Sequence, residues 1–207
     1  MYIPICDTFE PFCKLFLQKM AKKFIIIGSS NSVNIQNGHP THDSLQNVKI
    51  KNYSRPGAEV EIYSEKSILK QLPKKSDNLH VIIFCGSNGI DNDHFNVLTL
   101  KYQRMILRVM STLDSCNISC ILPLVRGCDL AQHKMQLFFM NILKTRLESY
   151  GIECYNVHDY LSNEQKQISN LFGAKDIAKK NYVHISASCR QVVHELLAKI
   201  VEKTSKC

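Results

Sequence analysis

The sequence predicts a three-layer α/β/α sandwich built on a mostly parallel sheet of about five strands. Short apolar runs alternate with long segments of helical periodicity, as expected when helices link the strands of a parallel sheet. Polar turns that contain glycine follow several of the apolar runs. A length of 207 residues and a hydrophobic content of 44% suit one domain with its own core.

Five segments are expected to form strands. Four are short apolar runs, and the second in chain order alternates between apolar and polar residues instead. The continuous run at 80–85 is typical of a strand that is buried on both faces. The predicted strands are residues 23–27, 47–52, 80–85, 118–122 and 152–157.

Three long helices and one short helix are expected between and after these strands. In the first long helix, Leu98, Tyr102, Ile106 and Val109 recur at helical spacing, and Gly151 marks the end of the second. The long helices are predicted at 95–113, 131–149 and 186–203, and the short one within 58–71.

Residues 1–22 are expected to form an appendage to a domain that spans residues 23–207. Pro4 and Pro11 interrupt this segment, and a short helix after Pro11 would place several apolar side chains on one face. These side chains are Phe12, Leu15, Phe16 and Met20. Docking on the main domain is one interpretation, and contact with a partner or a membrane surface is the other.

The chain is basic, with 26 Lys and Arg residues against 18 Asp and Glu residues, a formal charge of +8 and a pI near 9.0. This excess favours anionic partners such as nucleic acid or an acidic lipid surface. The alternative is a basic surface without a partner, because the charges are scattered along the chain. No apolar run reaches the roughly 18 residues of a membrane span.

The nine cysteines include no C-x-x-C pair, which favours a reduced, intracellular protein of the cytoplasm or nucleus. Asp7, Glu10 and Lys14 stand where a signal peptide would be apolar. Cys116 and Cys120 could form a zinc site only with further ligands that the spacing does not supply. We therefore expect neither a metal nor a cofactor.

Four polar segments lie where the predicted sheet would bind a ligand, at the carboxyl ends of strands or before the last helix. Three of their residues have a plain structural interpretation when taken alone: Ser30 as a turn cap, Asn88 as a turn residue, and His184 as a residue that caps the last helix or packs against it. The loop at 28–31 could also cradle a phosphate. The segments are residues 28–31, 55–58, 86–89 and 181–186.

In this order the segments resemble the sequence blocks of the SGNH (GDSL-type) hydrolase superfamily. The strand at 24–27 followed by Gly28-Ser29-Ser30 resembles the first block, and 54–58, 81–88 and 181–186 resemble the later ones. The resemblance covers about residues 23–201 and implies a flavodoxin-like sheet and hydrolysis of a small ester or acyl substrate.

By this resemblance Ser30 is the nucleophile, His184 is the base and Asn181 stands at the position of the acid. The N–H groups of Ser30 and Gly57 and the side chain of Asn88 form the oxyanion hole. The roles suit the residue types, because a serine hydroxyl needs a base near neutral pKa and a developing oxyanion needs donors.

The chain departs from the family pattern at three positions: Asn181 replaces Asp, Ser29 replaces Asp, and Gly89 replaces Asp after the asparagine of the third block. An amide can orient the imidazole but cannot stabilise its positive charge. Asp159 and Asp176 are alternative acids, although both lie far from the matched position in sequence. Two functions therefore stay open: an esterase with a Ser-His dyad, or a non-catalytic module that binds a protein, lipid or nucleic acid.

Overall fold

The computed structural model describes part of the chain, and every structural statement below concerns that part. The described residues are 23–29, 48, 50–57, 60, 63, 69–73, 79–85, 95–113, 117–122, 130–178 and 184–205. The predicted appendage at 1–22 lies outside them, so its division from the domain stays a prediction.

Five parallel strands form one sheet in the order β2-β1-β3-β4-β5. The strands are β1 (Lys23–Gly28), β2 (Ile50–Asn52), β3 (Leu79–Phe84), β4 (Asn117–Leu122) and β5 (Glu153–Asn156). This order is the flavodoxin-like one, and it confirms the predicted fold class. Each predicted strand is present, with ends shifted by up to three residues.

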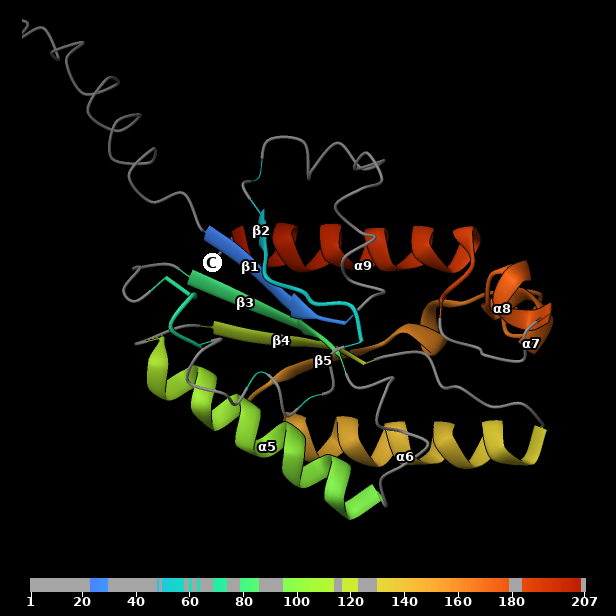
Figure 1. The fold of residues 1–207 in the computed structure, drawn as a ribbon, viewed down its shortest axis with the longest axis horizontal. Coiled ribbons are helices and arrows are strands. Elements are labelled where there is room, and N and C mark those ends of the chain that lie inside the picture. The colour runs from blue at the N-terminus through green and yellow to red at the C-terminus, as the bar shows by residue number, and fades with distance from the viewer. Residues whose placement is uncertain are drawn as a thin grey trace, which may run out of the picture.

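Helices cover both faces of the sheet (Figure 1). Helices α5 (Phe95–Thr112) and α6 (Leu130–Glu148) lie on one face, and α9 (Ala187–Ser205) lies on the other. All three long helices were predicted within two residues at each end. The short helix predicted within 58–71 is described only at 60, 63 and 69–71, where the backbone has helical or turn geometry.

The core has two halves because side chains of a strand alternate between the faces of the sheet. On β1, Ile25 and Ile27 pack toward α5 and α6, whereas Phe24 and Ile26 pack toward α9. Strand β3 is buried along its whole length. A sheet covered on both faces requires such apolar, mostly β-branched strands.

The stretch between β5 and α9 contains three short elements that the sequence did not predict: η2 (Val157–Tyr160), α7 (Ile168–Leu171) and α8 (Ala174–Ala178). Strand β5 ends where the side chain of Asn156 accepts a hydrogen bond from the backbone N–H of His158. Elements of four or five residues are too short to show helical periodicity, which explains why the pattern missed them.

Four cysteines of the described residues, Cys85, Cys120, Cys154 and Cys189, are buried free thiols. Burial raises the pKa of the Cys85 thiol to about 12. These side chains act as small apolar residues of the core. In the same part of the chain, no helix combines the length and the hydropathy that crossing a membrane requires.

Two histidines meet where α6 packs beside η2. The ring of His133 is almost fully buried and lies 5.7 Å from the ring of His158, centroid to centroid. Burial lowers the pKa of His133. Burial also lowers the pKa of His158, with further lowering by His133 and Lys166 and a partial opposing effect of Asp159.

We therefore expect the free energy of unfolding to fall as the pH drops below about 6.5, the ordinary histidine pKa. Since the folded pKa values are lowered, the unfolded chain takes up protons first, and acid favours unfolding. Urea unfolding at pH 7.5 and 5.5 measures this loss. His133→Gln should lose less stability between the two values than the wild type, and equal losses would contradict the assignment.

Candidate active site

The candidate site lies at the carboxyl ends of β1 and β3, which are neighbours at the centre of the sheet. The chain continues from β1 to β2 on one side and from β3 to β4 on the other, so the order of strands reverses between them. In open α/β sheets this switch point is where ligands bind. The first and third predicted blocks follow these two strands.

Hydrogen bonds to both neighbours hold the end of β1. The N–H of Arg55 donates to the carbonyl of Gly28 at 2.9 Å, and the N–H of Ser29 donates to the carbonyl of Phe84 at 3.2 Å. The Ser29 side chain is buried. The chain is therefore fixed on both sides up to the residue that precedes Ser30.

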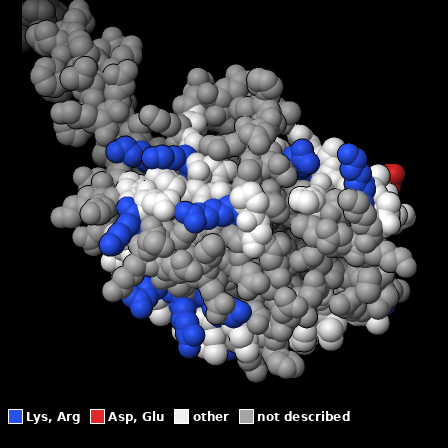
Figure 2. Space-filling view, viewed as in Figure 1, with Lys and Arg blue, Asp and Glu red and all other residues white. Residues whose placement is uncertain are grey.

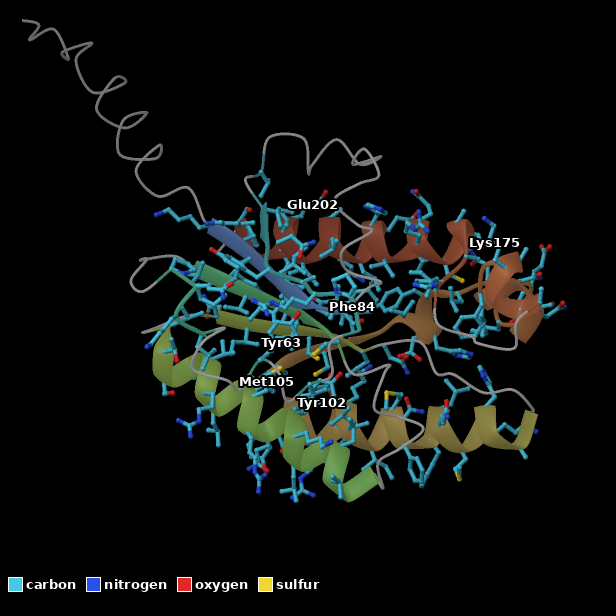
Figure 3. All side chains as sticks on the ribbon, in the orientation of Figure 1. Tyr63, Phe84, Tyr102, Met105, Lys175 and Glu202 are labelled. Carbon is cyan, nitrogen blue, oxygen red and sulfur yellow. The ribbon has the colours of Figure 1, made fainter. Side chains whose placement is uncertain are left out.

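Buried tyrosines bind carbonyl groups at the ends of the two central strands. The hydroxyl of Tyr63 donates to Gly28, and the hydroxyl of Tyr102, from α5, donates to Cys85 just beyond β3. Both rings lie in the interior of the molecule (Figure 3). Burial raises the pKa of Tyr63 to about 12 and that of Tyr102 well above its usual range, so both keep their protons and donate.

Gly57 lies in the exposed turn after β2, with φ of 71°. This left-handed backbone favours glycine, and a Cβ built there would meet no atom within 4 Å. Two residues earlier, Arg55 joins the turn to the end of β1 through its N–H, and its guanidinium donates to Gln71 at 3.2 Å. Arg55 therefore braces this loop.

His184 precedes α9, which begins on the side of the sheet to which the strand arrows point (Figure 1). Its side chain is exposed, and its carbonyl accepts from the N–H of Gly173 at 2.9 Å. Ile185 forms an antiparallel bridge with Phe172. The cap of α9 is Ser186, whose hydroxyl accepts from the N–H of Cys189 at 3.3 Å. Of the two structural interpretations of His184, the capping role therefore belongs to Ser186, and packing against the last helix stays open.

The structure thus places two of the five predicted site residues, Gly57 and His184, at the end of the sheet to which its strands point. Ser30, Asn88 and Asn181 lie outside the described residues, so the sequence-based assignment of all five roles stays a prediction.

The structure does not add support for Asp159 or Asp176, the two alternatives to an acid at position 181. The carboxylate of Asp159 lies 3.5 Å from the amino group of Lys144, at the surface. Asp176 belongs to α8. Among the described residues, no three His, Cys, Asp or Glu side chains gather closely enough to hold a metal ion.

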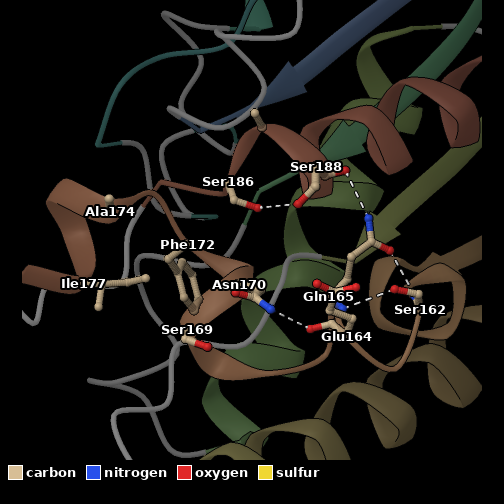
Figure 4. A pocket seen from close by; sticks show the side chains of 11 residues that line it. Ser162, Glu164, Gln165, Ser169, Asn170, Phe172, Ala174, Ile177, Ser186 and Ser188 are labelled. Atoms are coloured by element: carbon tan, nitrogen blue, oxygen red, sulfur yellow. Dashed lines mark hydrogen bonds between the residues drawn. The ribbon is translucent and has the colours of Figure 1, made fainter.

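A pocket of about 710 Å³ opens between α7, α8 and the start of α9 (Figure 4). The sequence did not predict this pocket. Two of its lining residues, Ser162 and Gln165, have the spacing of a capping box, which is a signal in the sequence that points to this segment. The Gln165 N–H donates to the Ser162 hydroxyl at 3.2 Å, and the Gln165 amide oxygen accepts from the Ser162 N–H at 2.9 Å. The pocket lining includes Glu164, Gln165, Asn170, Phe172, Ser186 and Ser188.

Tyr63→Phe should lower the free energy of unfolding by about 0.5–1.5 kcal/mol, because it removes one of the two donors to the Gly28 carbonyl, which keeps the N–H of Arg55. Urea unfolding measures the change. Tyr150→Phe is the matched control at an exposed tyrosine and should change stability by less than about 0.5 kcal/mol. An equal effect of the two substitutions would show that the Tyr63 hydroxyl does not stabilise the end of β1.

No model of a known protein family matches the sequence, and no curated protein matches it either. Solved structures do match the fold. A GDSL-like lipase from Bacteroides thetaiotaomicron superposes with a TM-score of 0.64 at 12% identity, over 95% of this chain and 98% of that one. A lipolytic protein of the G-D-S-L family from Veillonella parvula superposes with a TM-score of 0.62 at 16% identity, over 87% of this chain and 98% of that one.

An acetylxylan esterase from Geobacillus stearothermophilus, solved as a catalytic mutant, gives a TM-score of 0.60 at 12% identity, over 87% of this chain and 94% of that one. These structures span nearly the whole of each chain, although few residues are shared. The likeness agrees with the sequence blocks and with the order of strands. The chain has the fold of the SGNH (GDSL-type) hydrolases.

Proposed function

We propose that this protein is an SGNH-type esterase that hydrolyses a small ester or acyl substrate with a Ser-His dyad. The observation that carries the proposal is the junction at the end of β1. The residues that precede Ser30 are hydrogen-bonded to the turn that holds Gly57, and His184 lies on the same side of the sheet. The fold shared with lipases and esterases supports the same assignment.

In the proposed reaction the hydroxyl of Ser30 attacks the substrate carbonyl carbon while His184 takes the hydroxyl proton. The negative charge on the former carbonyl oxygen is held by the N–H groups of Ser30 and Gly57 and by the amide of Asn88. His184 then returns the proton to the departing alcohol. Water then attacks the acyl group on Ser30 while His184 takes its proton. When the bond between the acyl carbon and the Ser30 Oγ breaks, His184 gives this proton to the Oγ, so the acid leaves and the hydroxyl is restored.

Asn181 is the main reason to expect slow turnover. Its amide oxygen can orient the imidazole of His184, but it carries no charge to stabilise the imidazolium. In a serine protease with a full triad, the same replacement of Asp by Asn lowers turnover by about 10⁴. A binding module without catalysis is the competing function, and the uncharged Asn181 is the observation that favours it.

Hydrolysis of p-nitrophenyl acetate tests the nucleophile. We expect slow hydrolysis by the wild type and none above background for Ser30→Ala. Ser29→Ala is the matched control at the neighbouring serine and should keep most of the activity. Asn181→Asp should raise the rate by about 10²-fold or more. Absence of hydrolysis in both the wild type and Asn181→Asp would refute the esterase and leave the binding module.

Gly57→Ala separates a catalytic role from a purely conformational one. Gly151, which ends α6, also has a positive φ, 77°, and open space at its Cβ position, so Gly151→Ala is a matched control. Both substitutions should cost about 1 kcal/mol or more of stability. Only Gly57→Ala should reduce the hydrolysis rate, by about 10²-fold, because it disturbs an oxyanion donor. Equal rates for the two variants would remove Gly57 from the site.

A further inference from the structure

The outer surface of α5 and α6 is unusually apolar. Seven of the nine exposed large apolar side chains recorded for the described residues lie on these two helices. They are exposed by 36% to 62% of their area. We call this surface the α5/α6 face and define it by Val97, Leu100, Leu107, Met110, Met135, Phe138 and Ile142. Exposed apolar side chains that lie together on neighbouring helices are typical of a surface that contacts a partner or a membrane.

The α5/α6 face is also basic. Helix α5 contains Lys101, Arg104 and Arg108 and no acidic residue, and α6 has one acidic residue, Glu148, at its end. In Figure 2 the described surface over α5 shows Lys and Arg without Asp or Glu. Within the described part of the chain, the guanidinium groups of Arg104 and Arg108 have no ion-pair partner. The face therefore suits an anionic partner.

A hollow of about 540 Å³ lies in this face and is lined by Arg104, Leu107, Arg108 and Ser111. Residues four apart lie on the same side of a helix, so the two guanidinium groups are neighbours one turn apart. Arginine binds phosphate oxygens through paired N–H donors. The hollow combines this chemistry with an apolar side chain that is 58% exposed, Leu107.

Helix α9, on the opposite face of the sheet, shows that this composition is not a general property of the protein. Its exposed residues include Gln191, Glu195, Lys199 and Glu202, which are polar and of both charges. No large apolar side chain of α9 is among the exposed ones. One helical layer therefore has an ordinary solvated surface, and the other does not.

We propose that the α5/α6 face docks on a membrane surface that contains anionic phospholipid. Arg104 and Arg108 bind lipid phosphates, while Leu107 and Phe138 enter the boundary between headgroups and acyl chains. A second copy of the chain is a poorer occupant, because the basic residues of two such faces would repel each other. Nucleic acid offers no apolar phase to receive the exposed side chains. The docking does not require catalysis at the carboxyl end of the sheet.

Sedimentation of the full chain with vesicles tests the proposal. The probes are vesicles of phosphatidylcholine alone and of phosphatidylcholine mixed with phosphatidylserine. The wild type should bind only the mixed vesicles. Arg104→Glu combined with Arg108→Glu should weaken this binding at least about thirtyfold, since each basic residue contributes about a factor of five at an anionic surface. Ser30→Ala should bind like the wild type.

The matched control is Lys175→Glu combined with Lys199→Glu, which alters two exposed basic residues outside the α5/α6 face. Each charge-reversal pair changes the formal charge from +8 by −4 to +4. The control pair should bind mixed vesicles like the wild type. Leu107→Ser combined with Phe138→Ser leaves the charge unchanged and should weaken binding at least about tenfold.

Three results would overturn the proposal. The first is that the wild type does not bind mixed vesicles, whether or not it binds another polyanion such as an oligonucleotide or polyglutamate. Another is equal weakening by the two charge-reversal pairs, which would mean that net charge alone acts. The third is a concentration-dependent dimer in sedimentation velocity that Leu107→Ser with Phe138→Ser abolishes, which would make the face a contact between copies of the chain.

Discussion

The hydroxyl groups of Tyr63 and Tyr102 bind carbonyl groups at the ends of the two central strands, and the candidate site depends on these bonds. Where a parallel strand ends inside a protein, its final carbonyl groups need donors from outside the strand, because an unpaired buried carbonyl is costly. Gly28 receives one such bond from the N–H of Arg55 and a second from Tyr63. A tyrosine that cannot ionise near neutral pH supplies a permanent donor. The loops that carry the predicted serine and asparagine therefore begin from fixed points.

Helix α5 contributes to two surfaces of the molecule at once. Its inner side carries Tyr102 and Met105, which are fully buried behind the end of β3. Its outer side carries Arg104 and Leu107. Neighbours in sequence thus pack behind the end of β3 on one side and form the proposed lipid surface on the other. A single helix can do both because each residue is rotated by about 100° around the helix axis from the one before it.

The fold was predictable because its strands and long helices carry strong periodic signals, as in the buried run of β3. The tyrosine bonds were not, because Tyr63 and Tyr102 look like ordinary core aromatics and their partners are backbone atoms far along the chain. The cap of α9 also needed the structure, because Ser186 and His184 both stand just before the helix, although serine is the usual capping residue of the two.

The buried thiols allow the opening of each half of the core to be measured by chemical labelling. A reagent that alkylates thiolates cannot reach Cys120 or Cys154 between the sheet and α5 and α6 without local or global opening. Cys189 is the corresponding group on the α9 side. The rate at which each of these positions is labelled in dilute denaturant therefore reports how often that half of the core opens. The two halves of the core can thus be compared in the wild-type chain, without any substitution.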